Sequence, residues 1–307
     1  MLRLEARARG TTAMIKTNTE QLVCQSMIGE ITSPQGGINP YRVNPDGHPD
    51  VYPGVGGITY NLRIGDLAGE KFGDHVEPAV SISNFTQVHG QPGPNRALNQ
   101  FSCVGNIARV VSGDAKGETG RVTGKHGGIE HVLVDFAPKV LERLTIGDKI
   151  QIKACGCGLN LPDFPGIKVL NLDPALLAAI PLKKLSNSRL EVPVTHTVPA
   201  KIMGSGIGAS HSHSGDYDIQ MFDQGIVKEY GLENLRLGDF VAILDADATY
   251  GRIYKTGGVV IGIVVHASCV LAGHGPGVMI AMTSKEGLLV PRISTKANLT
   301  TYFAKMK

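Results

Sequence analysis

The chain has 307 residues, enough to bury a sizeable core and to form about two compact units. Its 39 glycines are well above the usual share of roughly 7%, while the apolar content of 42% is ordinary. This composition excludes a disordered or long-helical protein and favours short strands joined by tight turns. A net charge of +3 is too mild to imply a polyanionic partner.

Two segments could be mistaken for targeting or membrane sequences. Residues 1–13 are rich in arginine but too short and too charged for a signal peptide, and Met14 offers an alternative start, so we predict a disordered arm outside the fold. Residues 257–273 are largely apolar, yet they fall short of a span of about 20 residues and contain His266. We therefore expect a buried strand there, and a cytoplasmic protein without a membrane partner.

The predicted elements are mostly strands. A strand over 21–31 opens a region that prolines break as far as residue 53. Residues 89–95 are expected to form a loop, and Gly231 is expected to end the last helix. Further strands are predicted at 74–88, 104–111, 131–136, 192–202, 239–244, 259–266 and 278–282, and short helices at 138–144, 174–180 and 224–230.

Residues 101–155 form the clearest module. Strands alternate there with glycine turns, and a Lys116-Gly117 pair follows the first turn. This order resembles a small SH3-like barrel with a KOW-type motif, whose glycines supply the positive φ angles of tight hairpins. The predicted fold class is therefore mainly β: a multi-unit β barrel or sandwich with an SH3-like barrel and a few short helices.

The domain division follows the composition along the chain. Residues 14–160 form the predicted N-terminal β unit, which includes the barrel. Residues 161–190 carry proline-rich turns and are predicted to be a connector. Residues 191–307 form the predicted C-terminal β unit, which holds the candidate site.

The cysteines are an odd and sparse set, which predicts reduced thiols in a cytosol. They are Cys24, Cys103, Cys155, Cys157 and Cys269. Cys155 and Cys157 could place two sulfurs on one face of a strand for a metal or redox role. We prefer to interpret them as small buried residues in a crowded strand, because a metal or redox site needs more partners.

A glycine-rich segment of the C-terminal unit gathers ionisable side chains. His211, His213, Asp216 and Asp218 fall within eight residues, and alternation puts the two histidines on one face of an extended strand. Ionisable groups at this density on a loop favour function over packing. Solvated histidines and turn-capping aspartates are the structural alternative.

A second acidic pair, Asp245 and Asp247, ends an apolar strand. Asp-x-Asp at a strand end resembles the metal-and-nucleotide motif of glycosyltransferases, but that family needs about 100 residues of preceding βα units, and this chain has barrel-like strands instead. His-x-His likewise resembles the zinc-binding strand of amidohydrolases, whose position in a (β/α)8 barrel does not fit here.

We predict one metal site built from both clusters. His211, His213, Asp216 and Asp247 are the predicted ligands of a zinc or manganese ion, which would lower the pKa of a bound water. Asp216 and Asp247 should approach each other closely, with one of these histidines on the same concave surface. A separation beyond about 12 Å would leave no single ion able to join them.

Other residues carry predicted catalytic roles. Asp245 or His274 would act as general base, Arg252 would hold a substrate anion, and Tyr250 would contact the substrate. His274 lies in the glycine-rich turn 273–277, whose plain interpretation is a tight turn. The leading functional hypothesis is therefore a metal-assisted hydrolase of a small-molecule substrate.

The alternative is a non-catalytic binding or scaffold protein whose KOW-like barrel contacts RNA or another protein. Lys116, Arg121, Lys125 and His126 would form the contact face, and RNA binding would weaken steeply with salt. This hypothesis ranks second because no basic run is longer than two residues.

Four phrases taken together resemble one family. They are PGVGGITYNLRIGD at 53–66, GSGIGASHSHSGDYDIQ at 204–220, RLGDFVAILDADATYGR at 236–252 and IGIVVHASCVLAGHGPGV at 261–278. The combination resembles the prokaryotic domain of unknown function 4438 family, from Met14 to about Asn298. The resemblance implies a mainly β architecture and a homo-oligomer. It transfers no activity and no residue role.

Overall fold

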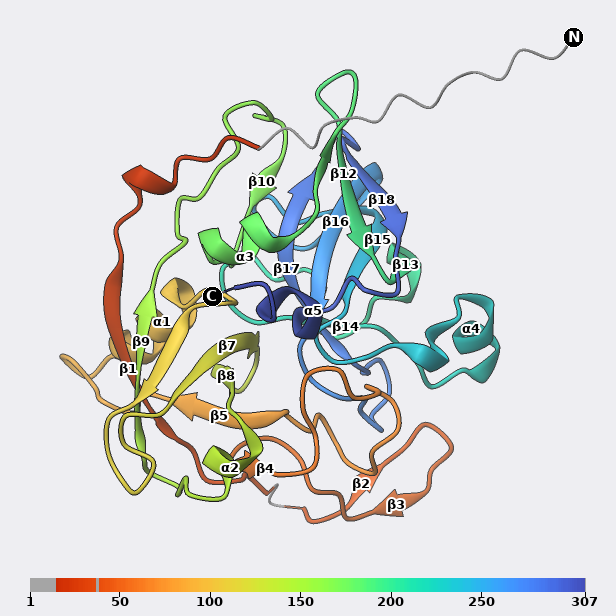
Figure 1. Cartoon of the computed structure of the whole chain (residues 1–307). Helices are drawn as coiled ribbons and strands as arrows, with labels where there is room; N and C mark the ends of the chain where they lie inside the picture. The colour runs from red at the N-terminus through yellow and green to blue at the C-terminus, as the bar shows by residue number, and fades with distance from the viewer. Residues whose placement is uncertain (1–14, 37–38, 307) are drawn as a thin grey trace, which may run out of the picture.

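The computed structural model describes residues 15–36 and 39–306, and the arm predicted over 1–13 lies outside this part of the chain. The described chain is mainly β, as predicted, and builds a closed barrel beside a mixed sheet (Figure 1). Its longest α-helix has nine residues. Over the described residues, no helix combines the length and the apolar character needed to cross a membrane.

Six antiparallel strands close the barrel, because β5 pairs with β8 on one side and with β1 on the other. Side chains alternate between the barrel interior and the outside, as in β9, where Ile150, Ile152 and Ala154 are buried. In order around the barrel the strands are β1 (Gln25–Ile31), β9 (Lys149–Ala154), β6 (Ile107–Val110), β7 (Thr119–His126), β8 (His131–Asp135) and β5 (Ala79–Ser83).

The barrel therefore extends beyond the module predicted over 101–155. That module supplies β6 to β9, and the chain before it supplies the two closing strands, β1 and β5. The strand predicted over 74–88 is shorter than expected, since β5 covers only Ala79–Ser83. The predicted loop over 89–95 contains the start of helix α1 (Gly93–Phe101), because a proline in the first turn begins a helix as readily as it interrupts a strand.

The mixed sheet has six strands, five of which lie side by side in one row. Within this row β13 and β15 are parallel, and the other neighbouring strands are antiparallel. In order the five are β10 (Lys168–Val169), β17 (Gly277–Ser284), β16 (Ile253–Val264), β15 (Phe240–Asp247) and β13 (His196–Pro199), with β14 (Tyr217–Asp218) also paired to β17. β16 has twelve residues and begins before the strand predicted at 259–266.

Smaller elements complete the described chain. The remaining strands are β11 (Lys183–Lys184), β12 (Leu190–Val194) and β18 (Leu289–Ile293) in a third sheet, the pair β2 (Arg42–Val43) and β3 (Pro49–Asp50), and β4 (Ile58–Thr59) on β5. The helices are α1, α2 (Pro138–Leu141), α3 (Pro174–Ala179), α4 (Gln224–Glu229) and α5 (Leu299–Phe303), with 3-10 turns η1 (Thr19–Gln21), η2 (Ala200–Ile202) and η3 (Leu232–Asn234). The predicted connector over 161–190 contributes β10, α3 and β11, and the three-part domain division stays a prediction.

The barrel has a hydrophobic core of its own, and a second buried cluster joins it to the mixed sheet. Val104 and Leu133 on the barrel side belong to the same buried cluster as Phe240 and Met282 of the mixed sheet. Gly124 in β7 allows the close approach, because a side chain there would overlap Val265. The end of β7 is thereby held against the C-terminal half of the chain.

Cys24 and Cys155 form a disulfide, so the prediction of reduced thiols is wrong for this pair. The bond joins the residue before β1 to the residue after β9, next to the paired residues Gln25 and Ala154. The two cysteines are 131 residues apart in sequence, and no local spacing rule could have connected them. The bond closes a loop that contains the whole barrel.

We expect reduction of this disulfide to lower the free energy of unfolding by about 2–4 kcal/mol, because the cross-link restricts the unfolded chain. Urea unfolding of the wild type with and without dithiothreitol measures the effect. A Cys24→Ala, Cys155→Ala double variant is the control and should respond little to the reductant. Equal unfolding midpoints for the oxidised and reduced wild type would contradict the prediction.

Candidate functional site

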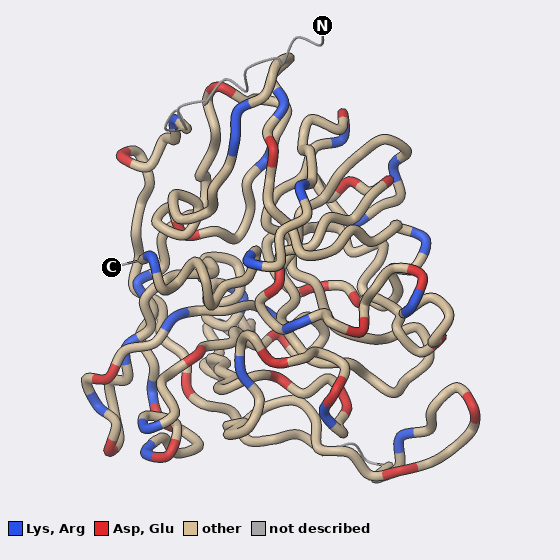
Figure 2. The backbone as a smooth tube through the Cα atoms, turned by 45° about the vertical axis from the view of Figure 1, so that its right-hand side comes forward, with Lys and Arg blue, Asp and Glu red and all other residues tan. Residues whose placement is uncertain are grey.

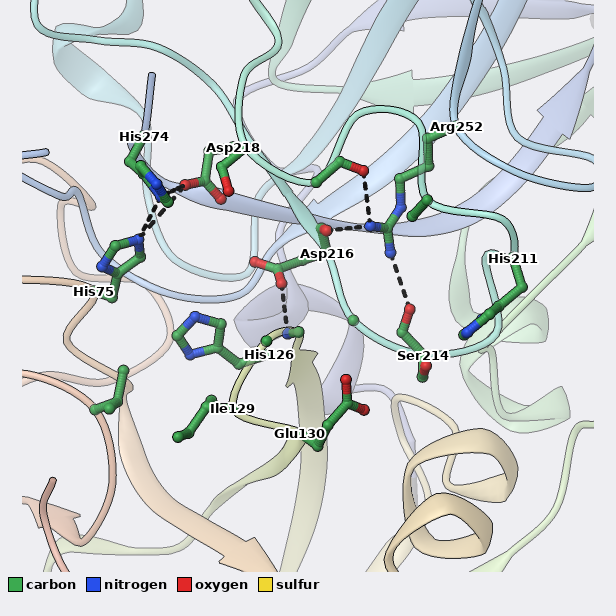
Figure 3. A pocket seen from close by; sticks show the side chains of 17 residues that line it. His75, His126, Ile129, Glu130, His211, Ser214, Asp216, Asp218, Arg252 and His274 are labelled. Atoms are coloured by element: carbon green, nitrogen blue, oxygen red, sulfur yellow. Dashed lines mark hydrogen bonds and ion pairs between the residues drawn. The ribbon is translucent and has the colours of Figure 1, made fainter. Parts of the chain in front are cut away.

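A pocket of about 510 Å³ opens where the barrel meets the C-terminal half of the chain (Figure 3). Its walls come from the segment before β5, from the turn between β7 and β8, and from C-terminal loops. His75, His126, Asp216, Asp218 and His274 are among the lining residues. The volume suits a small ligand, since small-molecule pockets usually measure about 300–1,000 Å³.

Carboxylates and imidazoles are concentrated in the lining of this pocket and among the buried residues that contact the lining. The carboxylates Asp74, Glu77, Asp216 and Asp218 are all buried, and the imidazoles of His75, His126, His131, His266 and His274 surround them. A buried carboxylate is costly unless opposite charge or hydrogen bonds compensate it. Among the described residues, Arg42 is the one arginine or lysine that forms a salt bridge with any of these carboxylates, at 3.1 Å from Asp74. Histidines or bound cations must balance the rest.

The first ligand group consists of His126, Asp216 and His266. His126 ends β7, Asp216 directly precedes β14, and His266 follows β16, so three distant segments meet here. All three residues are buried, and one ligand atom from each lies within 4.8 Å of the others. Asp216 Oδ2 and His266 Nε2 are 2.8 Å apart and form a buried ion pair when His266 is protonated. Beyond each other, neither atom has a hydrogen-bond partner among the described residues. A cation that displaces the proton of His266 could therefore bind both atoms.

The electrostatics of the pair favour a cation between them. Burial acts to lower the pKa of His266, but the charges of Asp216 and Asp218 outweigh it and raise that pKa well above its usual value. Burial likewise acts to raise the pKa of Asp216, and the charge of His266 brings it below its usual value. The negative field that holds a proton on His266 would also attract a divalent ion, which displaces protons from its ligands.

Acceptors on the far side of each ring fix the direction of these imidazoles. Glu77 Oε1 lies 2.6 Å from His126 Nδ1, and His266 Nδ1 donates to the carbonyl oxygen of Ala267 at 2.8 Å. The same Glu77 carboxylate accepts from His131 Nδ1 at 2.9 Å. Burial acts to raise the pKa of Glu77, but these histidines hold it far below its usual value. Metal-binding histidines characteristically donate their second ring N–H to a carboxylate or a carbonyl.

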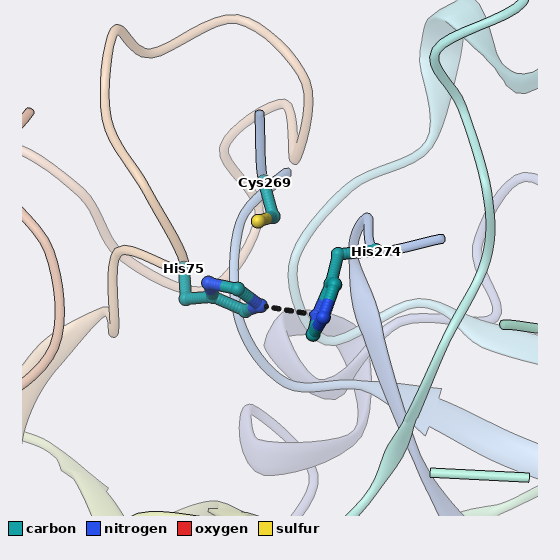
Figure 4. Close-up of side chains that lie close together, drawn as sticks. All are labelled: His75, Cys269 and His274. Atoms are coloured by element: carbon teal, nitrogen blue, oxygen red, sulfur yellow. Dashed lines mark hydrogen bonds between the residues drawn. The ribbon is translucent and has the colours of Figure 1, made fainter. Parts of the chain in front are cut away.

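A second ligand group lies beside the first and consists of His75, Cys269 and His274 (Figure 4). His75 Nε2 is 2.9 Å from His274 Nδ1. Asp218 Oδ2 lies 3.0 Å from His274 Nδ1, and Asp218 Oδ1 lies 3.7 Å from His266 Nε2 in the first group. The Asp218 carboxylate therefore lies between the two groups.

Four of the residues predicted from sequence line the pocket: His211, Asp216, Arg252 and His274. Asp216 and His274 belong to the two ligand groups, while His211 is exposed and lies apart from both in Figure 3. Arg252 donates to the main-chain carbonyls of Gly206, Ser214 and Asp216 and so holds the loop in place. Its predicted role in holding a substrate anion stays a prediction.

The structure does not assemble the four predicted metal ligands, which corrects the predicted site. Asp247 Oδ1 accepts hydrogen bonds from the hydroxyls of Thr249 and Thr283 at 2.6 and 3.0 Å, and Asp247 belongs to neither ligand group. His213 is exposed, and its main-chain carbonyl accepts from Lys125 Nζ at 2.7 Å. Asp247 therefore anchors the end of β15 by local hydrogen bonds.

Two further predicted residues lie outside the pocket lining. Asp245 Oδ1 accepts from the Gly257 N–H at 2.8 Å at the bend in the β15–β16 hairpin. Tyr250 is 85% exposed, and Lys168 Nζ lies 5.0 Å from the centre of its ring. Asp245 is exposed, and its predicted role as general base stays a prediction.

The contact face predicted for RNA is also corrected. Lys125 is fully buried, where it donates to Asn171 Oδ1 at 2.8 Å, and His126 is buried in the first ligand group. Arg121 donates to the main-chain carbonyls of Gly105 and Met306. Acidic and basic residues are interspersed along the chain rather than separated into two regions (Figure 2).

Sequence reasoning missed His75, Glu77 and His131 entirely. The run Asp74-His75-Val76-Glu77 carried a signal, since three ionisable residues are unusual at the start of a strand expected to be buried. His131 opens β8, at the start of the strand predicted over 131–136, but no role in the site was predicted for it. The contacts of these residues are made with segments far away in sequence, so spacing alone could not place them.

Two family models and one solved structure match the chain. The models are described as domain of unknown function (DUF4438), N-terminal, which matches residues 41–178, and domain of unknown function (DUF4438), C-terminal, which matches residues 179–303. No curated protein matches. A solved structure titled "Crystal structure of TM1086" shares 46% sequence identity with a TM-score of 0.89, covering 94% of this chain and 99% of that one.

Gly277 provides a test of how tightly the first ligand group is packed. A side chain there would overlap both Asp216 Oδ2 and His266 Nε2, so we expect Gly277→Ala to destabilise the fold by about 1–3 kcal/mol. The same variant should lose any metal that the wild type binds. Gly93→Ala is the matched control, because an added methyl there meets nothing within 4 Å. Thermal melting and metal content measure the two effects, and wild-type behaviour of Gly277→Ala would contradict the prediction.

Proposed function

The chain belongs to the DUF4438 family, and we propose that it is a metal-dependent hydrolase acting on a small polar substrate. The proposal keeps the function class expected from sequence and moves the ion to His126, Asp216 and His266. One observation carries it: Asp216 Oδ2 and His266 Nε2 lie 2.8 Å apart, buried and with no partner beyond each other among the described residues, and Asp216 lines the pocket.

The three side chains fit a divalent ion of the zinc type. Two imidazoles and one carboxylate form a common ligand set for such ions in enzymes, and a fourth position is left for water or substrate. Ligand atoms about 2.0–2.2 Å from one ion lie roughly 3.3–3.6 Å apart at tetrahedral angles and roughly 2.8–3.1 Å apart at right angles. The 2.8 Å between Asp216 Oδ2 and His266 Nε2 corresponds to a right angle, so a tetrahedral ion would move these two atoms apart by about 0.5 Å. A divalent ion held there would supply a water of lowered pKa and polarise a substrate oxygen.

Residues of the pocket rim complete the proposed chemistry. The exposed carboxylate of Glu130 lines the pocket beside the ligand groups (Figure 3), where it can accept a proton from an attacking water. Its backbone has a φ of 59°, in the left-handed region, and its carbonyl oxygen accepts from Asn99 Nδ2 at 2.9 Å. This anchored turn directs Glu130 toward the pocket. In the proposed mechanism Glu130 takes the base role that sequence reasoning gave to Asp245.

The size and lining of the pocket support a small and polar substrate. A volume of about 510 Å³ holds a molecule of modest size, and much of the wall is made of imidazole, carboxylate and main-chain groups. An extended polymer would need a longer groove. A substrate with a carbonyl or phosphoryl oxygen to face the ion satisfies both constraints.

Asp216→Asn tests the proposal with little change of shape. The amide oxygen can still accept the Gly127 N–H bond that Asp216 Oδ1 accepts at 2.8 Å, while Oδ2 becomes a donor facing His266. We expect metal affinity to fall at least about tenfold, because a ligating carboxylate is lost. Hydrolysis of a panel of small esters, amides and phosphate esters should be abolished. Elemental analysis of purified protein and zinc titration after chelation measure the binding.

Asp247→Asn is the matched control, because Asp247 is also a buried aspartate but accepts bonds only from threonine and local groups. It should keep the metal and the activity, even where it lowers the melting temperature. A wild-type protein that contains no metal and binds none on titration would overturn the proposal. So would an Asp216→Asn variant that binds zinc as tightly as the wild type.

A further inference from the structure

We infer that the pocket contains a second metal subsite, formed by His75, Asp218 and His274 with Cys269 as the fourth ligand, and that Asp218 joins it to the first. The inference deepens the proposed function and rests on it for the hydrolytic chemistry. The ligands of the second subsite are inferred from their own contacts, so the second subsite and the proposed function can be disproved separately.

Three atoms converge tightly in this subsite. His75 Nε2, His274 Nδ1 and Asp218 Oδ2 are separated by 2.9, 3.0 and 3.6 Å. The separations of 2.9 and 3.0 Å fit ligand atoms at right angles around one ion, roughly 2.8–3.1 Å, and the separation of 3.6 Å fits a tetrahedral angle, roughly 3.3–3.6 Å. Cys269 Sγ lies within 4.8 Å of one ring nitrogen of His75 and one of His274 (Figure 4). Two imidazoles, a carboxylate and a thiolate are a ligand set that suits zinc.

The direction of the His75 ring brings these atoms together. Asp74 Oδ1 lies 2.9 Å from His75 Nδ1 and so orients the ring with Nε2 toward His274 Nδ1 and Asp218 Oδ2. A divalent ion can bind all three atoms at once.

Donors from the surrounding chain hold the ligand atoms in position. The Leu271 N–H donates to Cys269 Sγ at 3.2 Å, and the Gly275 N–H donates to Asp218 Oδ2 at 3.2 Å. Arg42 pairs with the outer oxygen of Asp74 and leaves the inner oxygen to orient His75. Such outer contacts typically fix the ligands of a metal site.

Cys269 changes its protonation when the ion binds. Its Sγ now donates to Asp74 Oδ1 at 2.8 Å, which shows that the sulfur carries a proton in the absence of an ion. Binding releases this proton to solvent and leaves a thiolate bonded to the metal, with no change of oxidation state. The Asp74 oxygen keeps its bond from His75.

Asp218 connects the two subsites. Its Oδ2 belongs to the second, and its Oδ1 lies 3.7 Å from His266 Nε2 in the first. The His75 and His266 ring centres are only 5.2 Å apart. Enzymes with two ions about 3.5–4 Å apart place one on each side of a reacting oxygen. The Asp218 carboxylate is positioned to span such a pair.

Metal counting on the full-length protein tests the inference. After removal of ions with a chelator, titration with zinc alone should give about two ions per chain for the wild type and about one for His274→Ala. His274 is half-buried, and His274→Gln provides a second variant with a smaller loss of volume. Asp216→Asn should also bind about one ion, because it removes only the first subsite.

Cobalt substitution identifies the fourth ligand. A thiolate bound to cobalt(II) gives a near-ultraviolet charge-transfer band, which we expect in the wild type and in Asp216→Asn but not in Cys269→Ser. Cys103→Ser and Cys157→Ser are matched controls that remove the other free thiols and should keep the band.

Either of two results would overturn the second subsite: an unchanged zinc count in both His274 variants, or no charge-transfer band in cobalt-loaded wild type. One further result would overturn the proposed function and leave the second subsite intact. If Asp216→Asn keeps every ion and all activity while His274→Ala loses one ion, the second subsite stands and the first does not.

Discussion

The structure depends on how buried carboxylates are compensated between the barrel and the mixed sheet. Asp74, Glu77, Asp216 and Asp218 are all withdrawn from water, and each unpaired ion would cost several kcal/mol. Imidazoles form ion pairs with these carboxylates. His126 and His131 come from the barrel, and His266 and His274 come from the C-terminal half. Most of these pairs form within one half: Glu77 with His126 and His131, Asp216 with His266, and Asp218 with His274. The contacts of His75 with Asp218 and of Cys269 with Asp74 join the two halves, and the pocket lies at this junction.

Close backbone contacts set the position of Asp216 within that junction. Gly127 in the β7–β8 turn and Gly215 in the facing loop approach so closely that an added side chain on Gly215 would meet the Gly127 backbone at 3.0 Å. This approach lets the Gly127 N–H donate to Asp216 Oδ1, and Arg252 fixes the same loop through its carbonyls. One oxygen of Asp216 is thus anchored and the other is left for a ligand. The glycines noticed in the sequence as turn formers serve here to bring two loops into contact.

The sequence predicted the kind of fold and the neighbourhood of the site, but not its partners. Glycine turns between alternating strands predicted a barrel over 101–155, because hairpin chemistry is local. The closing strands β1 and β5 lie within the strands predicted over 21–31 and 74–88, but nothing local showed that they pair with the barrel. Asp216 and His274, which the sequence singled out, line the pocket, whereas Asp247 lies outside it, and nothing near Asp247 in sequence shows that Thr283 donates to its carboxylate. Local pattern locates reactive residues, and strand pairing decides which of them meet.

Protonated histidines compensate the buried carboxylates of this site only at the cost of repulsion between neighbouring rings. The ring centres of His126 and His266 are 4.2 Å apart, and those of His75 and His266 are 5.2 Å apart. Two imidazolium charges about 5 Å apart repel by about 3 kcal/mol at an effective dielectric constant of about 20. Burial and the charge of His266 act to lower the pKa of His75, but the bonds to Asp218 and Asp74 outweigh them and raise it. Divalent ions would move positive charge off the adjacent rings and into the spaces between the ligand atoms. Because Asp218 borders both proposed subsites, filling one would change the field in the other, and the two would act as one centre.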